Sequence, residues 1–178
     1  MSFWTAYIDD VAFSFRKQKQ MAEQALGQLS DDAFFRPPAE SCNSVAVIVK
    51  HLAGNLKSRW TDFRTSDGEK PWRDRDNEFV IGPVDTRERL LAAWEEGWAA
   101  LFQALGSLTE GDDTARITIR GEAHTVLQAV HRALTHAAYH AGQILYVARL
   151  VQPDGWRWVT VPPGRSQEVR ARGGNYLK

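Results

Sequence analysis

The segment HRALTHAAYHAGQILYVARL, residues 131–150, decides the fold class predicted for this chain. Together with the residues from Thr125 onward, it carries apolar side chains at intervals of three and four. These are Val126, Val130, Leu134, Ala137, Ala141, Ile144, Leu145 and Ala148. Residues with this spacing lie on one side of a helix, so the pattern is typical of a helix that buries one face. The stretch 125–150 is therefore predicted to be a long amphipathic helix.

Three further segments show the same periodicity and predict three more long helices. They cover about residues 3–29, 44–63 and 85–106. Asp85 and Glu88 have the spacing of a capping box, which predicts that the third of these helices starts at Asp85. Four helices with one apolar face each must bury those faces against one another. The sequence thus predicts an all-α protein with the architecture of a four-helix bundle.

The segments between and after these helices have other compositions. Residues 65–85 are rich in Asp, Arg, Gly and Pro and predict a long loop between the second and third helices. The alternating stretch RITIR, residues 116–120, predicts a short strand or an extended lead-in to the last helix. Residues 152–178 contain several Pro and Gly and predict an irregular tail. With 178 residues, the whole chain, 1–178, is expected to form a single domain.

The composition excludes several classes of protein. Lys and Arg number 22, as do Asp and Glu, so the zero net charge argues against a dedicated nucleic-acid binder. The single cysteine, Cys42, excludes an internal disulfide, which favours a reducing compartment. No stretch approaches 18 uninterrupted apolar residues and the N-terminus lacks the pattern of a secretory signal, so no membrane span is expected. A cytoplasmic location is the expectation that follows.

Two histidines stand out on the last predicted helix. His136 and His140 are four residues apart, so they stack on adjacent turns at one edge of the apolar face. Two imidazoles in this arrangement can hold one metal ion. His124 and His131 lie on the opposite edge of the helix and are predicted to be surface or structural residues.

A third histidine lies on the second predicted helix. His51 belongs to a polar row, Ser44, His51, Asn55 and Asp62, that runs directly beside the apolar stripe. Polar groups in this position point into a bundle and require partners there. His51 meeting His136 and His140 would supply three nitrogen ligands to a divalent metal. The spacing also fits histidines that form ordinary hydrogen bonds in the core, so both interpretations stay open.

Several other residues are candidates for the surroundings of such a site. Asn55 lies one turn from His51, and Gln143 lies one turn from His140, which is close enough to contact the ligands. Arg59 follows on the same helix, and Arg73 and Arg75 lie in the long loop. These arginines can bind an anionic substrate group such as a carboxylate. The two loop arginines can equally pair with their neighbours Asp74 and Asp76.

The motifs resemble a known superfamily. SVAVIVKHLAGNLKSRWTDFRTSDGEKPWRDRD, residues 44–76, followed by residues 131–150, resembles the DinB/YfiT-like superfamily of small four-helix metalloproteins, most of all a branch of unassigned function. The resemblance extends over about residues 3–164. It implies that His51, His136 and His140 bind a divalent metal, because the superfamily uses one histidine of the second helix and the two of its H-x3-H motif. It also implies a helix-packed homodimer.

The resemblance and the residues together narrow the chemistry. Characterised relatives include transferases and isomerases that use thiols such as bacillithiol and mycothiol, which implies a small thiol as substrate or partner. The residues between His136 and His140 are Ala-Ala-Tyr, so the HExxH general base of metallopeptidases is absent. A thiol S-transferase is therefore favoured, with a metal-dependent hydrolase or a non-catalytic metal-binding stress-response or sensor protein as alternatives. Imidazole ligands suit zinc, nickel, iron and copper, so the sequence does not select the metal.

Overall fold

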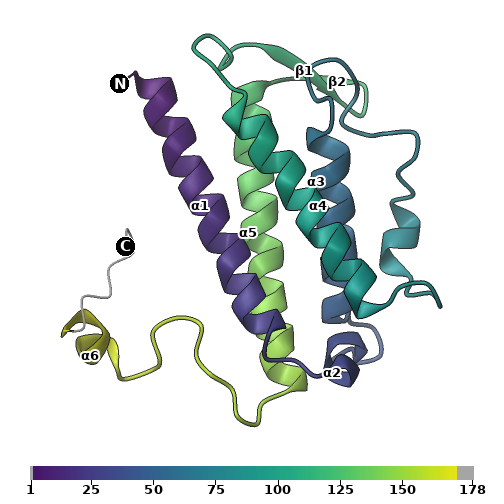
Figure 1. Cartoon of the computed structure of the whole chain (residues 1–178), viewed down its shortest axis with the longest axis vertical. Coiled ribbons are helices and arrows are strands. Elements are labelled where there is room, and N and C mark those ends of the chain that lie inside the picture. Colours follow the sequence, from purple (N-terminus) through teal and green to yellow (C-terminus); the bar gives the residue numbers. More distant parts are fainter. Residues whose placement is uncertain (1, 172–178) are drawn as a thin grey trace.

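The computed structural model describes residues 2–171 and is mostly helical (Figure 1). Its long helices are α1 (Phe3–Leu26), α3 (Val45–Trp60), α4 (Arg87–Gly106) and α5 (Val126–Val151). The shorter elements are α2 (Asp31–Phe35), the 3-10 helix η1 (Asp76–Phe79), the strands β1 (Arg116–Ile119) and β2 (Glu122–Thr125), and α6 (Ser166–Ala171). The four segments predicted to be long helices are thus helical. The short α2 was not predicted, because five residues are too few to show a helical period.

A hydroxyl side chain caps the N-terminus of each long helix. The oxygen accepts a hydrogen bond from the backbone N–H three residues further on, and the caps are Ser2, Ser44, Thr86 and Thr125. Such a cap satisfies one of the free N–H groups of the first turn. The capping box predicted at Asp85 is therefore wrong by one residue. The Asp85 carboxylate instead accepts hydrogen bonds from Lys50 Nζ at 2.9 Å and from the Gly82 N–H at 2.7 Å.

The long helices pack side by side around an apolar core (Figure 1). Helix α3 lies between α4 and α5 and contacts both, and α1 packs against α5. Helices α3 and α4 approach closely at Gly97, where a Cβ atom would lie 2.7 Å from the carbonyl oxygen of Ala53. The largest fully buried side chains are Phe15, Phe34, Trp94 and Trp98. Helix α3 therefore has one side toward the tryptophans of α4 and another toward α5.

Of the two alternatives predicted for RITIR, a short strand or an extended lead-in, the structure has the strand, and it forms an antiparallel hairpin with β2. The register pairs Arg116 with Thr125 and Ile119 with Glu122. Asp67, in the long loop, accepts hydrogen bonds from the backbone N–H groups of Arg120 and Gly121 at 2.8 and 2.7 Å. The loop and the hairpin are thus fastened to one another beside the end of α3.

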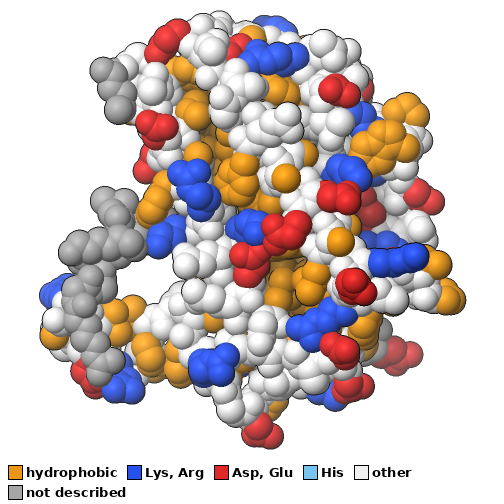
Figure 2. All heavy atoms as spheres, in the orientation of Figure 1, with side chains coloured by type: hydrophobic (Ala, Val, Ile, Leu, Met, Phe, Trp, Pro, Cys, Tyr) orange, Lys and Arg blue, Asp and Glu red, His pale blue; other side chains and the backbone are white. Residues whose placement is uncertain are grey.

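The tail contains a short helix that was not predicted. Residues 166–171 form α6, and Arg165 donates to the Glu168 carboxylate at 2.9 Å across its first turn. The expectation of a fully irregular tail is wrong in this segment, because the ion pair supports one helical turn despite the preceding Pro and Gly. In residues 2–171 no helix is long and apolar enough to cross a membrane. On the face shown in Figure 2, Lys and Arg side chains are interspersed with Asp and Glu side chains.

Candidate metal centre

Three histidines from two helices converge at one point between α3 and α5. His51 lies on α3, and His136 and His140 lie one turn apart on α5. One ring nitrogen of each lies within 4.8 Å of a ring nitrogen of both others. The ring centroids are 4.4, 4.9 and 5.4 Å apart. The structure therefore brings together the histidines that the sequence selected and positions them to hold a metal ion.

Burial keeps the imidazoles of His136 and His140 in the neutral form. His51 and His140 are buried and His136 is half-buried. Burial, together with the neighbouring His140 and His51, lowers the pKa of His136 to about 3. Burial and the nearby His51 lower the pKa of His140 to about 4. Both rings are thus uncharged at neutral pH, which is the form that binds a metal.

A carboxylate from the long loop orients His51. Nδ1–H of His51 donates to Oε2 of Glu78, on η1, over 2.9 Å. This leaves Nε2 of His51 as the free acceptor. Histidines that bind metals usually donate their other ring N–H to a carboxylate, a carbonyl or water in this way, which fixes the tautomer and the direction of the ring.

Glu78 is itself held by a buried arginine. Nε of Arg73 donates to Oε1 of Glu78 at 2.7 Å and Nη2 donates to Oε2 at 2.9 Å, a two-pronged contact of high geometric specificity. Burial alone would raise the pKa of Glu78, but hydrogen bonds from His51 and Arg73 outweigh it and lower that pKa. The carboxylate also lies directly against Gly54 on α3, where any side chain would collide with it. Glu78 is therefore an ionised, immobilised partner of His51.

Gln143 orients His140 as Glu78 orients His51. Nδ1–H of His140 donates to Oε1 of Gln143 at 2.8 Å, and the Gln143 amide donates in turn to the Tyr139 hydroxyl at 2.9 Å. Gln143, one turn from His140 in the sequence, therefore contacts the His140 ring. As at His51, the hydrogen bond leaves Nε2 of the ring as an acceptor.

The separation of the ring nitrogens fits a single divalent ion. Nε2 of His136 and Nε2 of His140 face one another at 3.1 Å. Two imidazole nitrogens bound to one zinc ion at about 2.0–2.1 Å lie roughly 3.3 Å apart in a tetrahedral site. The observed pair is close to that separation, and both rings are uncharged. The donor set suits a divalent metal without selecting zinc, nickel or iron.

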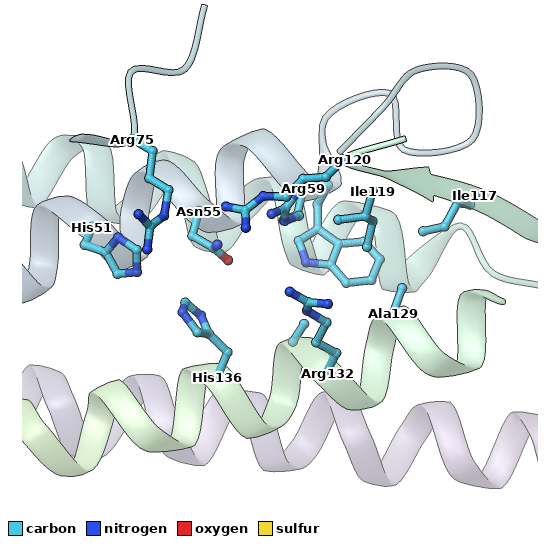
Figure 3. A pocket seen from close by; sticks show the side chains of 12 residues that line it. His51, Asn55, Arg59, Arg75, Ile117, Ile119, Arg120, Ala129, Arg132 and His136 are labelled. Atoms are coloured by element: carbon cyan, nitrogen blue, oxygen red, sulfur yellow. The ribbon is translucent and has the colours of Figure 1, made fainter. Parts of the chain in front are cut away.

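A cavity of about 240 Å³ adjoins the cluster (Figure 3). His51 and His136 line one end of it, and Asn55 and Arg59 line the wall that α3 provides. The rest of the wall comes from Arg75 in the loop, from the hairpin and from the N-terminal half of α5. Two of the predicted surrounding residues, Asn55 and Arg59, thus lie at the cavity rather than behind the ligands.

The remaining candidate residues lie elsewhere or have other partners. His131 is exposed and His124 lies on β2, so both remain outside the cluster as expected. Arg73 pairs with Glu78 and Glu69 and not with Asp74, whereas Arg75 is 3.8 Å from Asp76 and lines the cavity. The two loop arginines therefore have different roles.

One residue of the site was missed by the sequence analysis. Glu78 lies 27 residues after His51 in a loop without helical periodicity, so no spacing rule connected the two. The signal that was available is the pattern of charges: Arg73 and Glu78 are five residues apart, just before the apolar run Phe79–Ile81. An acidic residue next to an apolar run is a candidate for burial with a partner.

Fold and site together define a mostly helical protein with a candidate three-histidine metal centre. Over residues 2–165 the chain matches the family described as "Protein of unknown function (DUF1572)", and it belongs to this family. The matched region begins at the cap of α1 and ends just before α6, so it contains the whole site. No curated protein and no solved structure matches the chain.

Proposed function

We propose that this protein is a divalent-metal-dependent enzyme that activates a small thiol for transfer of its sulfur to an electrophilic substrate. The observation that carries the proposal is the three-histidine cluster at one end of a cavity. Three protein ligands are typical of catalytic zinc sites, where a further position is open to water or substrate. The resemblance to DinB/YfiT-like proteins, and the four-helix-bundle architecture it implies, supports a thiol as the co-substrate.

The reaction follows from the donor set. A divalent ion held by His51, His136 and His140 would lower the pKa of a bound thiol, so that its proton is released to water. The thiol sulfur then forms a bond to an electrophilic carbon, and the leaving group departs from that carbon with the bonding electrons. Glu78 and Gln143 keep His51 and His140 in the required tautomers, and the cavity holds the electrophile.

The partners of Glu78 favour this chemistry over hydrolysis. Many metal-dependent hydrolases use a free carboxylate as the general base that takes a proton from water. Both oxygens of Glu78 accept hydrogen bonds from Arg73, and one also accepts from His51, so this carboxylate already has its donors. Glu78 does not line the cavity, and within residues 2–171 none of the cavity-lining residues is acidic.

Metal analysis combined with thiol-consumption assays tests the proposal. Purified protein should contain about one divalent ion per chain, and replacement of His51, His136 or His140 by Ala should remove both metal and thiol turnover. His124→Ala and His131→Ala, outside the cluster, serve as matched controls and should retain both. Full metal occupancy in His51→Ala would contradict the three-ligand site. Metal without turnover of any thiol would favour the hydrolase or the non-catalytic sensor.

Cys42 is the internal competitor for the role of nucleophile. It is exposed and lies two residues before Ser44, the cap of α3. The proposal requires Cys42→Ala to remain active with an added thiol while His51→Ala is inactive. Activity that disappears with Cys42 would reassign the nucleophile to the protein.

We also propose that the protein forms a homodimer through its helices. Helix α5 presents Tyr139, Tyr146 and Leu150 to solvent, with exposed fractions of 62%, 69% and 52%, which is a large apolar surface for one helix. Sedimentation analysis at micromolar concentration should give twice the mass of the chain. A monomer at that concentration would contradict the proposal.

A further inference from the structure

The cavity beside the histidines is unusually rich in arginine. Its lining residues include Arg59, Arg75, Arg120 and Arg132, which come from α3, the long loop, the hairpin turn and α5 (Figure 3). Segments far apart in the sequence thus bring four guanidinium groups to one cavity, and none of its described lining residues is acidic. Like charges that converge in this way repel one another unless an anion lies between them.

The carboxylates nearby neutralise only part of this charge. Glu69 is shared, since its Oε2 accepts from Arg59 Nη2 at 3.1 Å and from Arg120 Nε at 2.8 Å. Arg75 has only a distant contact with Asp76, at 3.8 Å. In the described part of the chain, the Arg132 guanidinium forms no hydrogen bond or ion pair. The cavity therefore has a positive excess that an incoming anion can neutralise.

Two buried donors at the cavity lack acceptors. Within residues 2–171, Arg59 Nη1 and Trp60 Nε1 are buried and form no hydrogen bond. The Arg59 side chain is 10% exposed and Trp60 is 4% exposed, so water does not readily replace the acceptor. A buried donor without an acceptor costs about 1–3 kcal/mol, and more when it is charged. Both residues line the cavity, so an oxyanion bound against them is a candidate acceptor for these donors.

The other walls are apolar. Ile117 and Ile119 project from β1, and Ala129 and Ala133 line the side that α5 provides. The volume of about 240 Å³ is below the roughly 300–1,000 Å³ of pockets for drug-sized ligands, so the occupant is small. A compact apolar body bearing one oxyanion matches both the donors and these walls.

We propose that this cavity binds the oxyanion of a small organic acid, held by Arg59, Arg132 and the indole N–H of Trp60. His136 lines the same cavity, so the opposite end of the acid lies beside the histidine cluster. Binding of the acid is independent of the reaction. That the bound acid is also the electrophilic substrate rests on the proposed function. If that function holds, the electrophilic substrate is a small organic acid.

Calorimetric titration of the full-length, metal-loaded protein tests the inference. The probes are benzoate, phenylphosphonate and the uncharged benzamide. We expect both anions to bind and benzamide to bind at least tenfold more weakly, since hydrogen bonds to charged groups contribute about 1.5–3 kcal/mol. The anion that binds with the higher affinity indicates whether the natural ligand carries a carboxylate or a phosphate-like group.

Variants assign the binding to the named donors. Arg132→Gln should weaken benzoate binding about tenfold, and Trp60→Phe, which removes only the N–H, should weaken it about threefold to tenfold. Arg16→Gln, at an exposed position on α1, is the matched control and should bind normally. Melting temperatures of all variants verify that they are folded.

Two results would overturn the inference. One is equal binding of benzoate and benzamide, or no binding of either anion. The other is benzoate binding that requires the metal but is unaffected by Arg132→Gln and Trp60→Phe, which would mean direct coordination to the ion. Anion binding without thiol turnover would instead reject the proposed function and leave the anion site standing.

Discussion

The tryptophan core on one side of α3 and the histidine site on another are held together differently. Trp98 packs edge-on against Phe15 and Trp94, with ring centroids 6.2 and 5.5 Å away. These contacts are apolar and depend mainly on volume. The histidine site is instead held by directional hydrogen bonds, in which Glu78 accepts from both Arg73 and His51. Substitutions in the core should therefore change stability, and substitutions in the histidine site should change metal binding.

The largest effect is expected from Trp98→Ala. Trp98 is 1% exposed, and truncating a buried tryptophan typically lowers the free energy of unfolding by about 3–5 kcal/mol because a cavity remains. Denaturant titration of the metal-free protein measures this loss. The molecules that stay folded should retain the metal affinity of the parent protein. A large fall in affinity would show that the two regions are not separable.

Glu78→Gln should mainly lower the metal affinity and change the stability of the fold much less than Trp98→Ala does. Loss of the carboxylate that orients a metal-binding histidine commonly weakens the metal about 10- to 100-fold. Competition with a chelator at neutral pH measures the affinity. Glu122→Gln, at an exposed position on β2, is the control and should leave it unchanged. Unchanged affinity in Glu78→Gln would mean that His51 does not depend on its partner.

A pair of glycine variants sharpens the comparison at the helix contact. In Gly97→Ala the new methyl group meets the Ala53 backbone at 2.7 Å, so α3 and α4 must move apart at a cost of about 1–3 kcal/mol. Gly142→Ala on α5 meets nothing within 4 Å and should stabilise the protein by about 0.5–1 kcal/mol. Thermal unfolding of both variants checks the opposite signs.

The last comparison concerns pH. In the folded metal-free protein the pKa values of His136 and His140 are about 3 and 4, below the ordinary 6.5. Below pH 6.5 the unfolded chain therefore takes up protons that the folded chain does not, and stability falls as the pH decreases toward 4. Denaturant midpoints between pH 7 and 4 measure the slope. It should diminish in a variant carrying both His136→Gln and His140→Gln.

The two regions also differ in how far the sequence predicted them. His136 and His140 lie on one helix with an unambiguous period, and His51 lies beside the apolar stripe of another, so helix geometry made the three candidates for one site. Glu78 belongs to a loop in which successive side chains follow no period. Arg73 and Arg75 illustrate the same limit: they are two residues apart, yet one is buried against Glu78 and the other lines the cavity.

Local ambiguity accounts for the smaller errors. Asp85 and Thr86 are both good caps, and only the ion pair with Lys50 shows that Asp85 belongs to the loop. The short α2 is five residues long, too short for a periodic pattern to be distinguished from a turn. The exact start of a helix and the formation of a short helix depend on contacts between distant segments. Residue propensities carry no information about these contacts.

The hydrogen bonds from the hairpin turn to Asp67 join two walls of the cavity. Arg120 and Ile119 belong to the hairpin. Arg75 and Glu78 belong to the long loop, which Asp67 joins to the hairpin through these hydrogen bonds. We therefore expect a displacement of the hairpin to shift the loop that carries Glu78, the partner of His51. A fluorophore at Glu122, an exposed residue of β2, would test this expectation as a remote reporter of cavity occupancy.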